Sequence, residues 1–160
     1  MPTAHSVVDA LLCMLDQCYD KRAWHGPHVK ASIRGVDIKE AAWRPQPKRK
    51  NVAEQVLHIA YWKYVVRRKL RGDKRGSFPL KGTNWFAVST RLSEALWDEY
   101  QQLLADQHAE LRKAVAELAG KGRPSVSAEK VHLISGVAAH DVYHAGQIRL
   151  LRAMYESRKK

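Results

Sequence analysis

Apolar residues recur at helical spacing along most of the chain and predict four long helices, at about 7–23, 51–71, 90–118 and 127–157. The sequence Ser6-Val7-Val8-Asp9 has the pattern of a capping box, and Asn51-Val52-Ala53-Glu54 repeats it at the start of the second helix. Gly72 follows the second helix, and Ser127 is placed to cap the last one. Because apolar residues of the second helix cover more than one stripe, we expect it to be buried on a broad face.

Two long connections separate these helices. Residues 28–47 hold short apolar runs that Gly35 interrupts and two prolines end, so we expect a linker with a turn or two of helix there. Residues 72–88 combine glycines and prolines with aromatic residues, and they are long enough to cross from one end of a bundle to the other. Such a crossover makes the second and third helices run in the same direction. With no convincing strand, the pattern predicts an all-α four-helix bundle.

The composition fits one domain over residues 1–160. Apolar residues make up 45% of the chain, enough for a real core, and no apolar stretch reaches the length of about 20 residues that a membrane span needs.

The start of the chain lacks the basic region of a signal peptide. Cys13 and Cys18 fall in one predicted helix, about 8–9 Å apart and beyond disulfide reach. We therefore expect reduced thiols and a cytoplasmic protein without a membrane contact.

The net charge of +12 leaves two interpretations open. Basic residues gather at 48–50, 67–71, 74–75 and 158–160, a distribution that is found in nucleic-acid-binding proteins and also on ordinary solvated helix faces. No helix-turn-helix, zinc-finger or RNP-type motif accompanies the charge, which argues against nucleic acid without excluding it.

The most informative residues are histidines on the last helix. His140 and His144 lie on its best apolar stripe, which consists of Leu133, Val137, His140, His144, Ile148 and Leu151. The His-x-x-x-His spacing lets two imidazoles on adjacent turns converge on one metal ion. His58, inside the broadly apolar second helix, is the natural third ligand. Three histidines from two packed helices would leave exchangeable positions on the metal.

Other interpretations of these histidines stay open on the residues alone. His140 and His144 could be core histidines bonded to Tyr, Asp or Gln, with His58 unrelated, or the imidazoles could stack without a metal. The remaining histidines are expected to be surface or structural residues, because they fall at helix ends, in loops or on polar faces: His5, His25, His28, His108 and His132.

Neighbouring residues could complete such a site. Gln147 shares the face of the two histidines and could bond a bound water or substrate, or simply pack in the bundle. Asp141 is about 100° around the helix from His140, so we expect it to bond a neighbouring helix or solvent. Three aromatic residues could line a pocket mouth or belong to the core: Tyr61, Trp62 and Trp85. No catalytic residue can be named.

Two segments resemble the signatures of the DinB/YfiT-like superfamily of metalloenzymes, which is distinct from the DNA polymerase that shares the DinB name. Residues 136–148 (GVAAHDVYHAGQI) resemble its last-helix motif, H-x-x-x-H followed by Gly-Gln-Ile, and residues 56–63 (VLHIAYWK) resemble its L-H-I-A-x-W motif. Further similarities are Trp24-His-Gly-Pro27, Trp43-Arg-Pro45, Phe78-Pro79 and Asn84-Trp85.

The resemblance implies an up-down-down-up bundle, a homodimer, and a divalent metal, most often Ni or Zn, held by His58, His140 and His144. Related members include S-transferases and isomerases that use a low-molecular-weight thiol. The leading hypothesis is thus a metal-dependent thiol S-transferase or hydrolase with a small-molecule substrate. The alternative is a non-enzymatic metal-binding protein whose basic surface binds nucleic acid or an acidic partner. Metal affinity is expected to fall as the pH drops through the usual histidine range.

Overall fold

The computed structural model describes residues 4–120 and 125–158, and this part of the chain is helical and contains no strand. Its long helices are α1 (Ala4–Tyr19), α4 (Val52–Arg71), α5 (Glu94–Ala116) and α6 (Ala128–Ser157). Short elements join or end them: α2 (Val29–Ile33), α3 (Ile38–Ala42) and the 3-10 turn η1 (Glu117–Ala119). The expected turn or two of helix within 28–47 is therefore confirmed.

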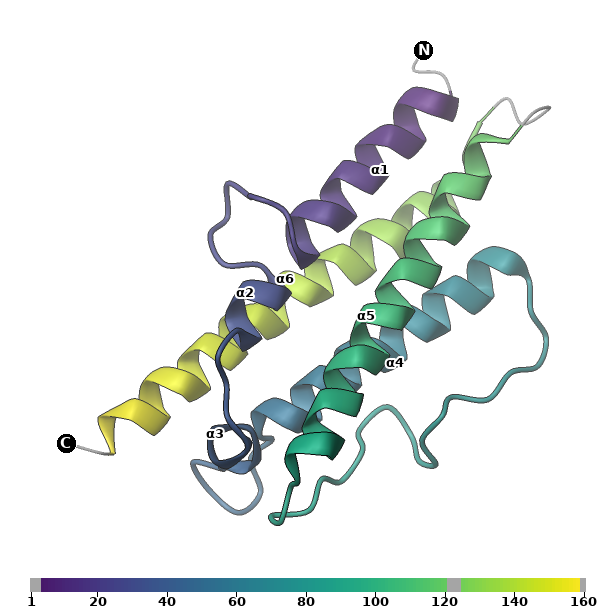
Figure 1. The fold of residues 1–160 in the computed structure, drawn as a ribbon. Coiled ribbons are helices and arrows are strands. Elements are labelled where there is room, and N and C mark those ends of the chain that lie inside the picture. The colour runs from purple at the N-terminus through teal and green to yellow at the C-terminus, as the bar shows by residue number, and fades with distance from the viewer. Residues whose placement is uncertain (1–3, 121–124, 159–160) are drawn as a thin grey trace.

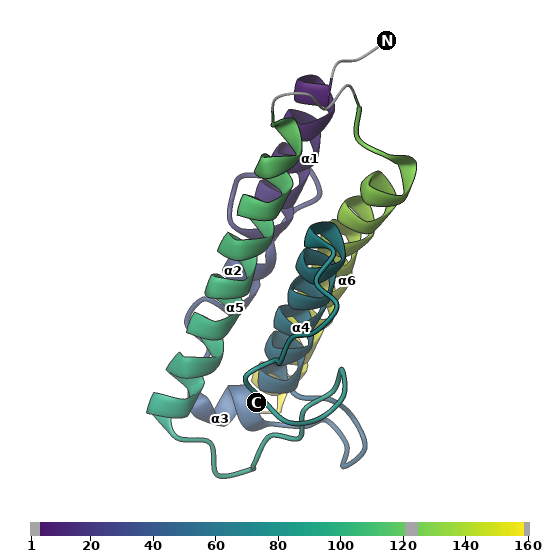
Figure 2. The same ribbon diagram turned by 90° about the vertical axis from the view of Figure 1, so that its right-hand side faces the viewer.

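The four long helices lie side by side (Figures 1 and 2). α4 packs most extensively on α5 and also contacts α6, while α1 contacts both α5 and α6. In Figure 1, α4 and α5 both run away from the end that holds α3, whereas α1 and α6 run toward it. The segment after α4 returns along the outside of the molecule to the α3 end before α5 begins.

Several predicted helix ends are confirmed by their capping bonds. Asn51 and Glu54 form the full capping box at the start of α4, and Gly72 ends this helix in the left-handed region at φ +75°. The Ser127 side chain accepts a hydrogen bond from the Lys130 N–H at the start of α6. These caps satisfy backbone groups that would otherwise lack partners, so they fix where α4 and α6 begin.

Other boundaries differ from the prediction. α1 begins at Ala4, so Ser6 lies within the helix and does not cap it. α1 ends at Tyr19, four residues before the predicted end, and residues 20–27 after it are exposed or partly exposed. α5 begins at Glu94, four residues later than the predicted start, and the side chain of Ser93 before it accepts the Leu96 N–H. Part of the expected loop at 120–126, the side chain of His5, and the last two lysines lie outside the described residues.

The first half of α4 is the most buried segment of the described chain. Every residue from Val52 to Ala60 is buried, which confirms the broad apolar face. Phe78 and Phe86 from the segment after α4 pack against Tyr61, so this connection lies on α4 close to His58. None of the described helices is both long and apolar enough to cross a membrane.

Candidate metal centre

The structure brings the three predicted histidines together between the first half of α4 and the middle of α6. His140 Nε2 lies 3.2 Å from His58 Nε2 and 3.0 Å from His144 Nε2. His58 and His144 are buried, and His140 is partly exposed. One nitrogen from each ring therefore points to a common centre, as the shared apolar stripe predicts.

The outer nitrogen of His58 is fixed by the main chain of the crossover. His58 Nδ1 lies 2.6 Å from the carbonyl oxygen of Asn84, and because a carbonyl only accepts, Nδ1–H is the donor. Nε2 is left with its lone pair facing the other histidines. Trp85 stacks on the His58 ring, with centroids 3.8 Å apart and planes 8° apart, so the ring is held from its face as well.

The outer nitrogen of His144 is fixed by two glutamines. His144 Nδ1–H donates to the Oε1 atom of Gln55 and lies 3.0 Å from the Oε1 atom of Gln147. This arrangement also leaves a lone pair on Nε2. His140 Nδ1, in contrast, is buried and has no hydrogen-bond partner in the described part of the chain.

The surroundings keep all three imidazoles neutral. Burial, together with the neighbouring His144 and His58, lowers the pKa of His140 to about 3. Burial and His58 lower the pKa of His144 to about 4. The pKa of His58 is also lowered, mainly by burial, although its bond to the Asn84 carbonyl opposes this shift. Neutral imidazole is the form that binds metals.

This donor set fits a divalent cation. His58 and His144 both present a bare lone pair to His140 Nε2, and one N–H on that atom cannot point at both. Two imidazole nitrogens on one tetrahedral zinc ion, at about 2.0–2.1 Å each, lie about 3.3 Å apart, close to the separations found here. A cation at the common centre would satisfy all three lone pairs, which no proton arrangement on His140 achieves.

The cluster lies in the wall of a pocket of about 900 Å³. Trp62, Trp85 and Gln147 line this pocket, and so does Gln55. Tyr61 does not line it, because its ring packs against Phe78 and Phe86. Of the three aromatic residues predicted at the pocket, Trp62 and Trp85 line it, and Tyr61 belongs to the neighbouring aromatic core.

Other sequence expectations had mixed outcomes. Asp141 pairs with Lys63 of α4, as its position around the helix predicts. His108, expected to be a surface or structural residue, is structural: it is buried against Tyr19, with ring centroids 3.7 Å apart, because α1 covers that side of α5. Only its expected place on a polar face is wrong. His28 caps α2 by accepting the Ala31 N–H, while His25 and His132 are exposed.

Sequence reasoning placed Gln147 at the site but missed the other two groups that orient the rings. Gln55 lies three residues before His58 on the same face of α4, and this spacing is the signal that could have found it. The Asn84 carbonyl has no such signal, because any residue could provide a main-chain oxygen at that point. These two missed bonds come from residues 26 and 89 positions away from the histidines that they hold.

The model of the DinB superfamily matches residues 29–148 of the chain. The chain belongs to the DinB superfamily. The matched range contains all three clustered histidines and both glutamines, so the site of this DinB-superfamily protein lies within the family-defining part of the chain. Searches of curated proteins and of solved structures found no match.

Proposed function

We propose that this protein is a divalent-metal-dependent enzyme of the DinB type, with Ni²⁺ or Zn²⁺ held by His58, His140 and His144. The observation that carries the proposal is the convergence of three Nε2 atoms within a pocket large enough for a small molecule. When bound, the cation supplies Lewis acidity that lowers the pKa of a thiol or water, which suits a thiol S-transferase or a hydrolase.

The chain's own residues prepare the site for that chemistry. Asn84 and the two glutamines hold His58 and His144 in the tautomer that presents Nε2, so binding needs no ring rotation. Trp85 and Trp62 cover His58 from two directions and keep water from that side of the cluster. The remaining side faces the pocket, where a small-molecule substrate can approach.

The rest of the proposal follows from the family resemblance and from the course of the helices in Figures 1 and 2. It comprises an up-down-down-up four-helix bundle, a homodimer and a cytoplasmic location. No observation on the described surface favours nucleic acid as the partner of this protein over a small molecule.

Elemental analysis of protein purified without a metal-binding tag tests the proposal directly. Wild type is expected to carry about one divalent ion per chain, as a three-histidine site would. His140→Ala is expected to lose the ion while the helical circular dichroism signal stays. His132→Ala is the matched control, because this exposed histidine lies on the same helix two turns away and should leave the metal content unchanged.

A metal-containing wild type then justifies screening thiol transfer and hydrolysis with the metal found. The proposal is wrong if wild type contains no divalent ion and takes up none after incubation with Zn²⁺ or Ni²⁺. It is also wrong if His140→Ala retains as much metal as His132→Ala does.

A further inference from the structure

The pocket has a cationic wall beside the metal centre. Lys48, Arg49 and Lys50 line it and come from the segment between α3 and α4. None of the described residues that line the pocket is Asp or Glu, and none of the ion pairs in the described chain involves these three cations. The positive charge of this wall is therefore available to a ligand.

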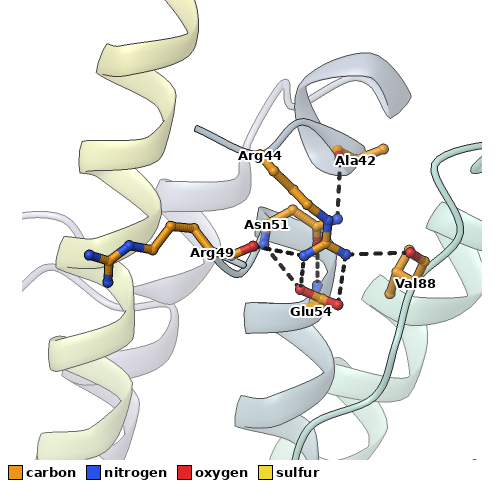
Figure 3. A network of polar contacts seen from close by, with 6 residues as sticks. All are labelled: Ala42, Arg44, Arg49, Asn51, Glu54 and Val88. Atoms are coloured by element: carbon orange, nitrogen blue, oxygen red, sulfur yellow. Dashed lines mark hydrogen bonds and ion pairs between the residues drawn. The ribbon is translucent and has the colours of Figure 1, made fainter. Parts of the chain in front are cut away.

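Hydrogen bonds hold the main chain of the segment that carries the cationic wall. Arg44 donates to both carboxylate oxygens of Glu54, at 2.6 and 2.8 Å, and to the carbonyl oxygen of Arg49 at 2.8 Å (Figure 3). Glu54 Oε2 also accepts the Asn51 N–H at 3.2 Å. The Arg49 guanidinium extends away from this network in Figure 3. Glu54 thus pairs directly with Arg44 and acts on Lys50 only at longer range, without an ion pair.

Lys50 places one of these charges next to the histidines. Its Nζ atom lies 5.1 Å from the centroid of the Trp85 ring, and the same ring stacks on His58. The side chain is half-buried, and its charge is one of the causes that lower the pKa of His58. A partly desolvated ammonium attracts an anion more strongly than a fully hydrated one does.

α6 gives the same pocket an apolar wall that solvent reaches. Tyr143 and Leu150 are each 63% exposed and Met154 is 41% exposed, and these three are among the few large apolar side chains in the described chain that are exposed. All three line the pocket. Its volume of about 900 Å³ lies within the usual range for small-molecule sites. A ligand with an apolar body would remove these side chains from water.

We propose that this pocket binds a small amphipathic carboxylate, with the carboxylate at Lys50 and Arg49 and the apolar body along Tyr143, Leu150 and Met154. The inference rests on the proposed function, because it names the substrate class of that site. A second copy of the chain suits the cationic wall poorly, since this protein carries a net charge of +12 and would bring like charge to it. A purely polar anion would leave the apolar wall in water.

Calorimetric titration of the zinc-loaded full chain with three probes tests the ligand class. Octanoate has both features, octanamide lacks the charge, and acetate lacks the apolar body. Octanoate is expected to bind at least about tenfold more tightly than either of the others, because each of them lacks the group that contacts one of the two walls. Equal binding of octanoate and octanamide, or of octanoate and acetate, would overturn the proposal, as would no octanoate binding to zinc-loaded protein.

Variants test the placement of the ligand. Lys50→Gln is expected to weaken octanoate binding about tenfold or more, whereas Lys81→Gln, an exposed cation outside the pocket, is expected to leave it unchanged. Leu150→Asn is expected to weaken octanoate binding but not acetate binding. If Lys50→Gln and Arg49→Gln both bind octanoate as wild type does, the carboxylate is not at this wall.

The same titrations on His140→Ala separate this inference from the proposed function. Octanoate binding that survives in metal-free His140→Ala supports the cationic wall even if wild type proves to bind no metal. Binding that is lost in His140→Ala but unchanged in Lys50→Gln would place the carboxylate on the metal and overturn the inference alone. A wild-type dimer that Leu150→Asn dissociates, seen by light scattering, would show that a second copy covers the apolar wall and would overturn it too.

Discussion

Two polar clusters lie between α4 and α6, and they differ in what satisfies them. His58 and His140 belong to the cluster at the pocket, and Lys63 and Asp141 belong to a sealed one. His140 and Asp141 are consecutive residues that point about 100° apart around α6. α6 therefore contributes one neighbouring residue to each cluster. The first is bordered by a pocket of about 900 Å³, while the side chains of Lys63 and Asp141 are both 0% exposed.

The sealed cluster contains its own counter-charges. Lys63 donates to Asp141 Oδ2, lies 3.3 Å from His108 Nδ1, and lies over the ring of Tyr19. Each of the four long helices thus contributes one residue. Burial and the Lys63 charge lower the pKa of His108 to about 2, so His108 accepts from the ammonium as a neutral ring. A cation is already present there as Lys63.

The histidine cluster has the opposite property. The inner nitrogens of His58 and His144 present lone pairs, and the outer nitrogens of these two rings donate to carbonyl and amide oxygens. No described side chain provides a cation at the centre of the cluster. The comparison shows why buried histidines alone do not indicate a metal. The ring nitrogen of His108 is satisfied by the Lys63 ammonium, whereas the inner lone pairs of the other three histidines would be satisfied together only by an external cation.

Removing the ammonium from the sealed cluster is expected to have the largest effect. Lys63→Met leaves the Asp141 carboxylate buried without its partner and should lower the free energy of unfolding by about 3–5 kcal/mol. Urea unfolding with an unchanged m-value measures this loss as a lower midpoint. Lys113→Met, at an exposed lysine of α5, is the control and should change the midpoint little.

The double variant Lys63→Met with Asp141→Leu sharpens this result. Because it removes both charges, it should recover most of the stability that the single variant loses. If Lys63→Met unfolds at the wild-type midpoint, the buried pair has no counter-charge role and the contrast between the clusters fails.

A smaller effect is expected at the histidine cluster, where the orienting bonds matter instead of a paired charge. Gln55→Leu removes the buried acceptor of His144 Nδ1–H and should weaken zinc affinity about 10- to 100-fold, the usual cost of losing such a partner. Competition with a chelating dye measures the affinity, and circular dichroism checks the fold.

Gln147→Leu is the matched comparison, because Gln147 accepts from the same nitrogen but is only partly buried. It should weaken affinity less than Gln55→Leu, since water can replace it and Gln55 remains. Wild-type affinity in Gln55→Leu would show that the ring orientation does not depend on this bond.

Much of the fold could be predicted because the local signals are strong. The capping box at Asn51, the left-handed Gly72 and the Ser127 cap mark helix ends by chemistry within a few residues. α1 was less well predicted, because Ser6 matches a cap locally but the helix continues past it to Ala4. The histidines of the site were found because two of them lie on an apolar stripe, where an unpartnered imidazole is costly.

The rest of the site depends on partners that are distant in sequence. Nothing near His108 predicts that α1 will bury it, and nothing near Asp141 selects Lys63, which lies 78 positions away. The charge of Lys50 matters because a network around Arg44 anchors its segment beside the pocket (Figure 3). Helical periodicity places residues on faces, but it does not determine which faces meet.

The smallest effect is expected from mild acid, and it separates this cluster from an ordinary set of three histidines. Histidines with the usual pKa of about 6.5 would be mostly protonated at pH 6, so zinc would displace about two protons per site. Here the pKa of His140 is lowered to about 3 and that of His144 to about 4 by burial, and that of His58 is lowered as well. The expected fall in metal affinity through the usual histidine range therefore moves to lower pH. Calorimetry at pH 6 in two buffers of different ionisation enthalpy should find fewer than one proton released per site, because His140 and His144 are already neutral there. Release of about two protons would show that the metal-free cluster is open to water and protonated, unlike the sealed one.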